Sequence, residues 1–291
     1  MDATITPLAD YACNTGEGPL WHPDQDAVWW TDIPAGKLFR FDCRTGEHHP
    51  VDIGRPVGGF TIQEDGRLLL FLDRGTIAVL NPDGSLVPVI DEIPDETTTR
   101  FNDVAADPEG RVFCGTMPTA DRKGRLYRLD TDGSLHLVLE DIGCSNGIGF
   151  TPDRTGMYYT DSFAYTITRF EYDRSTGAIS NPRLFSKAEE GGGFPDGMTV
   201  DRDGNIWSAR WDGSCLVRYN PEGEETGRIA FPVLKVSSVV FGDADMGAMY
   251  VTTAGGDTKE TDGPEAGTLY RVVVPGVRGV AEFRSRIRVP A

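Results

Sequence analysis

Four polar side chains occupy equivalent positions in an internal repeat of this 291-residue sequence. Each stands before a short apolar segment, which a turn rich in Asp, Pro or Gly follows. The four residues are Glu17, Asn102, Asn146 and Asp196. The same frame places Gly58 and Ser237 in two further copies, so the repeat occurs six times. Because equivalent positions of a closed radial repeat point to a common centre, we expect two carboxylates and two amides to meet there.

This set of side chains predicts a metal site. Two carboxylates buried together are unfavourable unless a cation or a proton compensates their charge. An all-oxygen set without thiolate or imidazole favours a hard divalent ion. We therefore predict that Glu17, Asn146 and Asp196 bind one divalent ion and leave positions open for water and substrate. Ca²⁺ is the first expectation, with Mg²⁺, Mn²⁺, Zn²⁺ and Fe²⁺ as alternatives.

Turn formation is the alternative explanation for these residues. Asn146 and Asp196 each precede a glycine, and Glu17 precedes Gly-Pro, which are sequences typical of turns. Turn propensity alone would not place acidic and amide residues in one shared position of separate repeats. The coincidence therefore favours a functional site over a set of unrelated turns.

The elements that must position these residues are short strands. After each turn a second apolar segment follows, for example Val112–Thr116, and then a third with a period of two, for example Arg125–Asp130. The repeat length of about 40 to 50 residues is that of a four-stranded propeller blade. The sequence predicts an all-β, six-bladed β-propeller with a central metal site, and one domain over residues 1–291. The segment Thr4–Thr6 is expected to add a strand to the blade that the C-terminal residues complete.

Composition excludes several classes of function. The formal net charge of −17 argues against binding of nucleic acid or an anionic membrane. The sequence has no apolar N-terminal signal segment and no apolar run of about twenty residues, so we expect a soluble, cytoplasmic protein. Its five cysteines are scattered and include no CxxC pair, which indicates neither a disulfide framework nor a zinc cluster. A closed propeller needs no partner, so we expect a monomer or a weak homo-oligomer.

Two patterns that suggest nucleophilic catalysis fail in their context. Gly143–Gly147 fits G-x-S-x-G, but the strand and turn that follow it are not the helix that a nucleophile elbow requires. The histidines are also poorly placed to act as a base: His22 is expected in a turn, His48 and His49 in a polar loop, and His136 in an alternating strand. A Ser-His-Asp triad is therefore not predicted.

Several motifs together resemble one known family. The segments that carry the resemblance are Glu17-Gly-Pro-Leu-Trp21, Arg100-Phe-Asn102-Asp103, Asp107-Pro-Glu-Gly-Arg111, Ser145-Asn146-Gly147 and Pro195-Asp196-Gly197. In order and content they are similar to the regucalcin, gluconolactonase and luciferin-regenerating-enzyme family, over essentially the whole chain. The resemblance implies a six-bladed propeller with one divalent ion held by Glu17, Asn146 and Asp196. It also implies substrate contacts from Arg100 and Asn102, with Asp196 as the general base.

The resemblance implies metal-dependent hydrolysis of a sugar lactone to the aldonic acid, with glucono-, xylono- and arabinonolactone as examples of the substrate. Two alternatives remain open: an organophosphate triester hydrolase using the same site, and a non-catalytic calcium-binding regulatory protein. One departure from the family lies after Met117, where some relatives carry an acidic pair that reaches sugar hydroxyls. Here the chain reads Pro118-Thr-Ala-Asp121-Arg-Lys-Gly124, and Asp121 is the candidate for that role.

Overall fold

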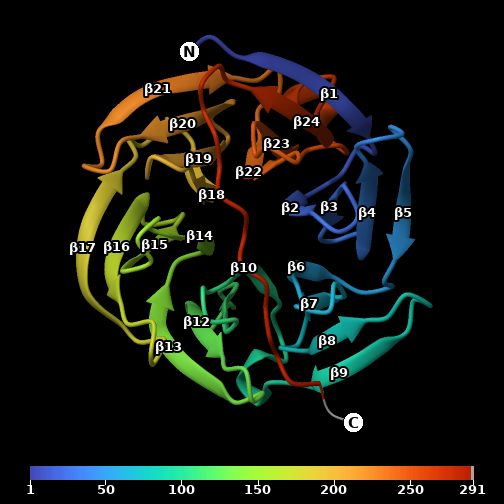
Figure 1. Cartoon of the computed structure of the whole chain (residues 1–291), viewed down its shortest axis with the longest axis vertical. Helices are drawn as coiled ribbons and strands as arrows, with labels where there is room; N and C mark the ends of the chain where they lie inside the picture. Colours follow the sequence, from blue (N-terminus) through green and yellow to red (C-terminus); the bar gives the residue numbers. More distant parts are fainter. Residues whose placement is uncertain (290–291) are drawn as a thin grey trace.

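The predicted six-bladed propeller is confirmed. The computed structural model describes residues 1–289, and these form six four-stranded antiparallel sheets around a central axis (Figure 1). In five blades the chain runs from the innermost strand to the outermost, with consecutive strands paired. The sixth blade is completed by the N-terminal strand, as predicted.

The first three blades follow one another along the chain. Blade 1 comprises β2 (Gly16–His22), β3 (Ala27–Asp32), β4 (Lys37–Asp42) and β5 (His48–Asp52). Blade 2 comprises β6 (Val57–Ile62), β7 (Leu68–Leu72), β8 (Ile77–Leu80) and β9 (Leu86–Ile90). Blade 3 comprises β10 (Phe101–Ala106), β11 (Val112–Thr116), β12 (Gly124–Leu129) and β13 (Leu135–Ile142).

The remaining blades complete the ring. Blade 4 comprises β14 (Ser145–Phe150), β15 (Gly156–Asp161), β16 (Thr166–Tyr172) and β17 (Ile179–Lys187). Blade 5 comprises β18 (Phe194–Val200), β19 (Ile206–Trp211), β20 (Cys215–Tyr219) and β21 (Glu225–Ala230). Blade 6 comprises β22 (Val236–Gly242), β23 (Ala248–Thr253), β24 (Thr268–Val273) and β1 (Thr4–Asp10).

Helix is confined to two single turns in the described chain, η1 (Pro94–Glu96) and α1 (Lys259–Asp262). Within residues 1–289, therefore, no helix has the length and apolarity needed to cross a bilayer. Two expectations were wrong: His48 and His49 begin strand β5 rather than lying in a loop, and His22 ends strand β2 rather than lying in the turn after it. An outermost strand is exposed on most of its length, so it lacks the apolar alternation that marks a half-buried strand.

The core lies between the blades. Buried apolar side chains form six clusters in the described residues, and each contains residues from two neighbouring blades. Between blades 1 and 2, for example, Trp29 and Leu38 pack with Phe60 and Leu70. Because each blade shares one cluster with each of its two neighbours, both faces of every sheet are covered.

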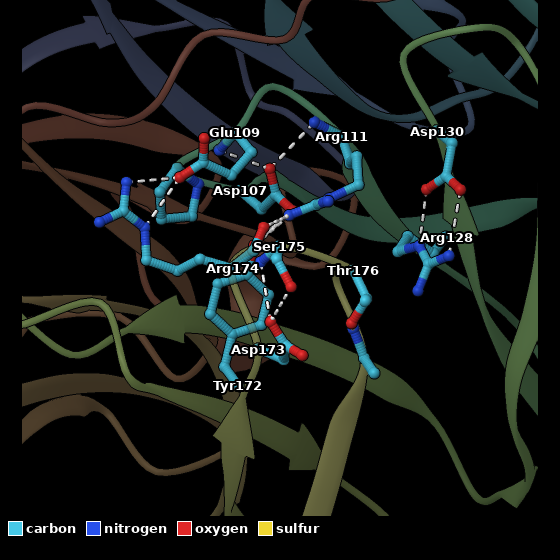
Figure 2. A network of polar contacts seen from close by, with 12 residues as sticks. Asp107, Glu109, Arg111, Arg128, Asp130, Tyr172, Asp173, Arg174, Ser175 and Thr176 are labelled. Atoms are coloured by element: carbon cyan, nitrogen blue, oxygen red, sulfur yellow. Dashed lines mark hydrogen bonds and ion pairs between the residues drawn. The ribbon is translucent and has the colours of Figure 1, made fainter.

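Polar contacts lock the turns that follow the inner strands. Asp107, fully buried after β10, accepts hydrogen bonds from the N–H groups of Glu109 and Arg111 and from the Tyr172 hydroxyl of the next blade, at 2.8, 2.9 and 2.6 Å (Figure 2). The Arg111 side chain donates to Asp107 Oδ2 at 2.5 Å and to the Arg174 carbonyl at 2.6 Å. This part of the family-like motif therefore joins blade 3 to blade 4 and lies away from the predicted site.

Residues 274–289, here called the C-terminal strap, cross the propeller axis on the face that carries these turns (Figure 1). The strap contacts the turn region of every blade, through Asp24, Ile62, Gly110, Arg154, Arg202 and Met246. Ser285 and Ile287 are buried against blades 2 and 3, and the Thr61 and Ser285 hydroxyls lie 2.7 Å apart. A small cavity of about 50 Å³ between the inner strands has Glu282 and Phe283 of the strap in its lining. The strap was not predicted from the sequence.

The strap should contribute measurably to stability. We expect Ile287→Ala to lower the free energy of unfolding by about 2–5 kcal/mol, because it removes a side chain that packs in the core between blades 2 and 3. Val280→Ala, in an exposed part of the same strap, should change it by less than about 0.5 kcal/mol. Urea denaturation of the two variants provides the measurement. Equal effects of the two substitutions would contradict a docked strap.

Candidate functional site

The equivalent positions of the repeat lie at the start of the innermost strands, as expected. Glu17, Asn102 and Asn146 are the second residues of β2, β10 and β14, and Asp196 is the third residue of β18. In each of the six inner strands the pairing register with the next strand shifts at this position. A bulge of this kind redirects a side chain, which explains how strand residues turn into the central channel. The sequence pattern located the positions but did not reveal the bulges.

The other two copies do not contribute to the site. A side chain at Gly58 would lie 2.0 Å from the carbonyl oxygen of Phe101, so the strands of blades 2 and 3 approach too closely for any other residue. Ser237 is fully buried; its hydroxyl donates to the Gly16 carbonyl and accepts from the Thr252 hydroxyl at 3.0 Å. Because these two positions are occupied by close contact between blades, only the other four copies of the repeat place a polar side chain in the site.

One cavity of about 320 Å³ contains all five predicted site residues. Its lining comprises Thr15, Glu17, Arg100, Asn102, Met117, Cys144, Asn146, Ser162, Phe163, Phe194, Asp196 and Trp211. Glu17, Asn102, Asn146 and Asp196 lie on the inner strands, and Arg100 directly precedes β10. The apolar residues Met117, Phe163 and Trp211 follow or end the second strands. Sequence reasoning missed these apolar residues because they share no position with the polar set.

Burial makes the two carboxylates of the cavity unfavourable as a pair of anions. Glu17 is 7% and Asp196 4% exposed. Burial first, and then the negative charge of Asp103, raises the pKa of Glu17 to about 8, although Gly18 N–H donates to its carboxylate at 3.1 Å. Burial and the neighbouring Glu17 raise the pKa of Asp196. Asp103 is a further acidic group that the sequence analysis did not single out, although it adjoins Asn102.

Hydrogen bonds hold the amides and the guanidinium together. Arg100 Nη1 donates to Asn102 Oδ1 at 2.7 Å, and Asn102 Nδ2 donates to Asn146 Oδ1 at 2.9 Å and to the Ser145 carbonyl at 2.8 Å. Asn146 Oδ1 retains a lone pair, because an amide oxygen can accept twice. Among the residues that line this cavity, Arg100 has the one cationic side chain.

The donor set fits a hard divalent cation. Among residues 1–289 no group of three or more His, Cys, Asp or Glu side chains could hold a metal ion. The set here has only two carboxylates, Glu17 and Asp196, and takes its third oxygen from Asn146. A divalent cation would offset the burial and the neighbouring negative charge that raise both carboxyl pKa values. All-oxygen coordination of this type suits Ca²⁺, Mg²⁺ or Mn²⁺.

Nucleophilic serine or cysteine chemistry does not fit the cavity. Ser145 is fully buried, and its Oγ accepts a hydrogen bond from Tyr159 at 2.7 Å. Burial raises the pKa of the Cys144 thiol to about 12, so this thiol stays protonated at neutral pH. No histidine of the described chain lines the cavity. The sequence analysis predicted no Ser-His-Asp triad, and these surroundings agree with that prediction.

The rim is apolar on one side and open on the other. Phe163, 56% exposed, meets Phe194 edge to face at 6.0 Å, and Tyr165 stacks on Phe194 at 4.7 Å. Asp121 is exposed and lies in a separate open groove. Phe163 lines both this groove and the cavity, at the boundary between them. The acidic residue proposed for sugar contacts is therefore outside the cavity itself.

The chain is similar to several known proteins over nearly its full length. Residues 15–255 match the family model described as the SMP-30/Gluconolactonase/LRE-like region. The chain is 48% identical over 295 residues to Pentonolactonase XacC of Haloferax volcanii, covering 98% of this chain and 99% of that protein. Its structure resembles that of a luciferin-regenerating enzyme, with a TM-score of 0.90, 27% identity, and coverage of 98% and 100%. It also resembles a structure described as a calcium-binding protein, regucalcin, from Agrobacterium tumefaciens, with a TM-score of 0.87, 25% identity, and coverage of 97% and 95%.

The buried charge of Glu17 leads to a pH-dependent prediction for protein kept in chelator. A folded-state pKa of about 8 lies above the value of about 4.3 for an unfolded chain, so stability from this group is present at low pH and is lost as pH rises through 8. Glu17→Gln should therefore raise the thermal midpoint at pH 8, by roughly 2–4 °C per kcal/mol, and have no such effect near pH 4. Differential scanning calorimetry at both pH values tests this, with the exposed Glu190→Gln as control. A lower midpoint at pH 8 would contradict a destabilising buried carboxylate.

Proposed function

The chain belongs to the SMP-30/gluconolactonase/LRE-like family, and we propose that it hydrolyses a sugar lactone of the pentonolactone class to the open aldonic acid, with one divalent cation bound at the cavity. The observation that carries this proposal is the 48% identity to a pentonolactonase over 98% of the chain. The cavity supports it chemically, because carboxylates, amides and a guanidinium provide the polar contacts that a polyhydroxylated ring requires.

Glu17, Asn146 and Asp196 would hold the cation, for which Ca²⁺ is the first candidate. The cation would supply Lewis acidity that polarises the lactone carbonyl and stabilises negative charge on its oxygen. Glu17 and Asn146 have no role in proton transfer in this scheme. They set the position of the cation relative to Asp196, and the inner strands hold them there.

Arg100 and Asn102 would orient the lactone ring, in different ways. Both N–H groups of Asn102 are already used, by Asn146 and by the Ser145 carbonyl. Its Oδ1 accepts from Arg100 and can accept once more, so Asn102 suits a substrate hydroxyl rather than a carbonyl. Arg100 keeps free N–H donors and suits the oxygens of the ester group.

Asp196 would act as the general base. Burial raises the pKa of its carboxyl when no cation is present, but a carboxylate that binds a cation is a weak base, so the acidity that the cation gives to a nearby water would supply much of the driving force. Asp196 takes a proton from water as the water oxygen bonds to the carbonyl carbon. The bond from that carbon to the ring oxygen then breaks, and the ring oxygen receives the proton from Asp196. The product is the aldonic acid, which ionises at neutral pH.

The first test is acid release from lactones in a weakly buffered indicator solution. Chelator-stripped protein should show no turnover above the spontaneous rate, and Ca²⁺, Mg²⁺, Mn²⁺, Zn²⁺ or Fe²⁺ added singly should restore it. We expect pentonolactones to give the highest kcat/KM in a panel that includes hexonolactones and a phosphotriester. Cation binding without turnover of any lactone would instead indicate a calcium-binding protein, and turnover of the triester alone would indicate the other hydrolase class.

Two substitutions separate binding of the cation from orientation of the substrate. Asp196→Ala should weaken cation binding and lower kcat by about 10²–10⁴-fold, because it removes a ligand and the base. Arg100→Lys should keep the cation and lower kcat/KM by roughly 10- to 100-fold, because a charge-assisted hydrogen bond of fixed geometry is lost.

Isothermal titration with the metal and steady-state kinetics measure the two effects. Arg183→Lys, on exposed β17, is the matched control and should behave like the parent protein. Full cation affinity and full turnover in Asp196→Ala would contradict the assignment.

A further inference from the structure

A continuous row of hydrogen bonds runs through the site and extends beyond the residues considered so far. Arg100 donates to Asn102, and Asn102 donates to Asn146, as described above. Asn146 Nδ2 then donates to Ser162 Oγ at 2.7 Å. The Ser162 hydroxyl in turn donates to the carbonyl oxygen of Pro195 at 2.6 Å. The row therefore links blades 3, 4 and 5 and ends beside Asp196.

The chemistry of its two ends determines the direction of every bond in the row. A guanidinium has only donors, and a backbone carbonyl has only an acceptor. Ser162 must donate to the Pro195 carbonyl, so its Oγ must accept from Asn146, and the N–H group is the only donor on the Asn146 amide. Asn102 must likewise present its oxygen to Arg100 and its nitrogen to Asn146. Reversing either amide would place two donors or two acceptors against each other.

We propose that Ser162 is a positioning residue that holds the Asn146 amide with its oxygen available to the cation. This inference rests on the proposed function, because it assumes that Asn146 is a ligand. With the amide reversed, its NH₂ group would take the place of the oxygen, and an amide nitrogen offers no lone pair to a divalent ion. Ser162 does not touch the cation or the lactone in this role; it acts through Asn146.

Ser162 is suited to this role by its burial and its position. It is 3% exposed and is the first residue after β15, in the turn that leads to β16. Its backbone N–H donates to the Cys144 carbonyl at 3.1 Å, and its carbonyl accepts from Tyr165 N–H at 3.0 Å. These backbone bonds do not involve the hydroxyl, so Ser162→Ala should keep the turn. The same hydroxyl joins β14 to β18, the two strands that carry Asn146 and Asp196.

The test is the affinity of the chelator-stripped 291-residue chain for Ca²⁺ alone and for Mn²⁺ alone, measured by isothermal titration calorimetry. Ser162→Ala should weaken both affinities by about 10- to 100-fold, as is typical when the partner that orients a metal ligand is removed. Thr160→Val is the matched control. Thr160 is fully buried two residues earlier, pairs with Asn146 across the strands, and its Oγ1 has no hydrogen-bond partner among the described residues. The control should bind within about twofold of the parent.

Two more substitutions separate the hydroxyl from the volume of the side chain. Ser162→Cys is close in size but has a weak donor and acceptor, so it should lose affinity as Ser162→Ala does. Ser162→Thr keeps the hydroxyl and should recover most of the parental affinity. A packing role predicts the reverse order, with Cys tolerated and Thr harmful, and that order would overturn the inference. So would a Ser162→Ala or Ser162→Cys variant that binds both ions within twofold of the parent.

Kinetics distinguish this inference from the proposed function. If the parent binds the cation and Ser162→Ala does not, the positioning role holds even when no lactone is turned over. If lactones are hydrolysed but Ser162→Ala keeps parental cation affinity, the function holds and the positioning role fails. In the variant, activity should return at high cation concentration with kcat near that of the parent, because the residues that contact the lactone are intact.

Discussion

The repulsion between Glu17 and Asp196, two carboxylates with almost no access to water, is the constraint on which the site depends. Burial of such a pair is unfavourable unless a positive charge compensates it. The surrounding groups compensate this negative charge only in part. Gly18 N–H donates to the Glu17 carboxylate, and Arg100 is the cationic side chain in the cavity lining. A rigid ring is needed to hold like charges together, and the six clusters between blades provide it.

The site arises from differences among copies of one repeat. Six inner strands carry the same bulge, and a perfectly symmetric ring would place six identical side chains around the axis. Gly58 allows two strands to approach, and Ser237 bonds to its neighbours, so neither projects a polar group into the cavity. The carboxylates and amides of the other four copies then face an apolar rim. The site thus lies where the copies of the repeat differ in sequence.

Much of this arrangement could be predicted from the sequence because it is periodic. The shared position of Glu17, Asn102, Asn146 and Asp196 located the inner strands, and the alternating segments located the third strands. Features that occur once could not be predicted in this way. Ser162 lies outside the repeated frame, the strap has no counterpart in any blade, and β5 is too exposed for its side chains to alternate. The bulges also leave no mark in residue type, since they are a property of pairing between two strands.

Within residues 1–289, the strap crosses the propeller axis on one face and narrows the space there. The space above it, on this far face, is a cavity of about 50 Å³, much smaller than the 320 Å³ cavity at the other end. If the 320 Å³ cavity is the site of lactone hydrolysis, as proposed above, substrate and aldonate anion would use the same mouth, one at a time. Occupancy by the released acid and by the next lactone are then mutually exclusive. With the function proposed above, product inhibition would therefore be competitive, and flux would depend on how quickly the acid is removed.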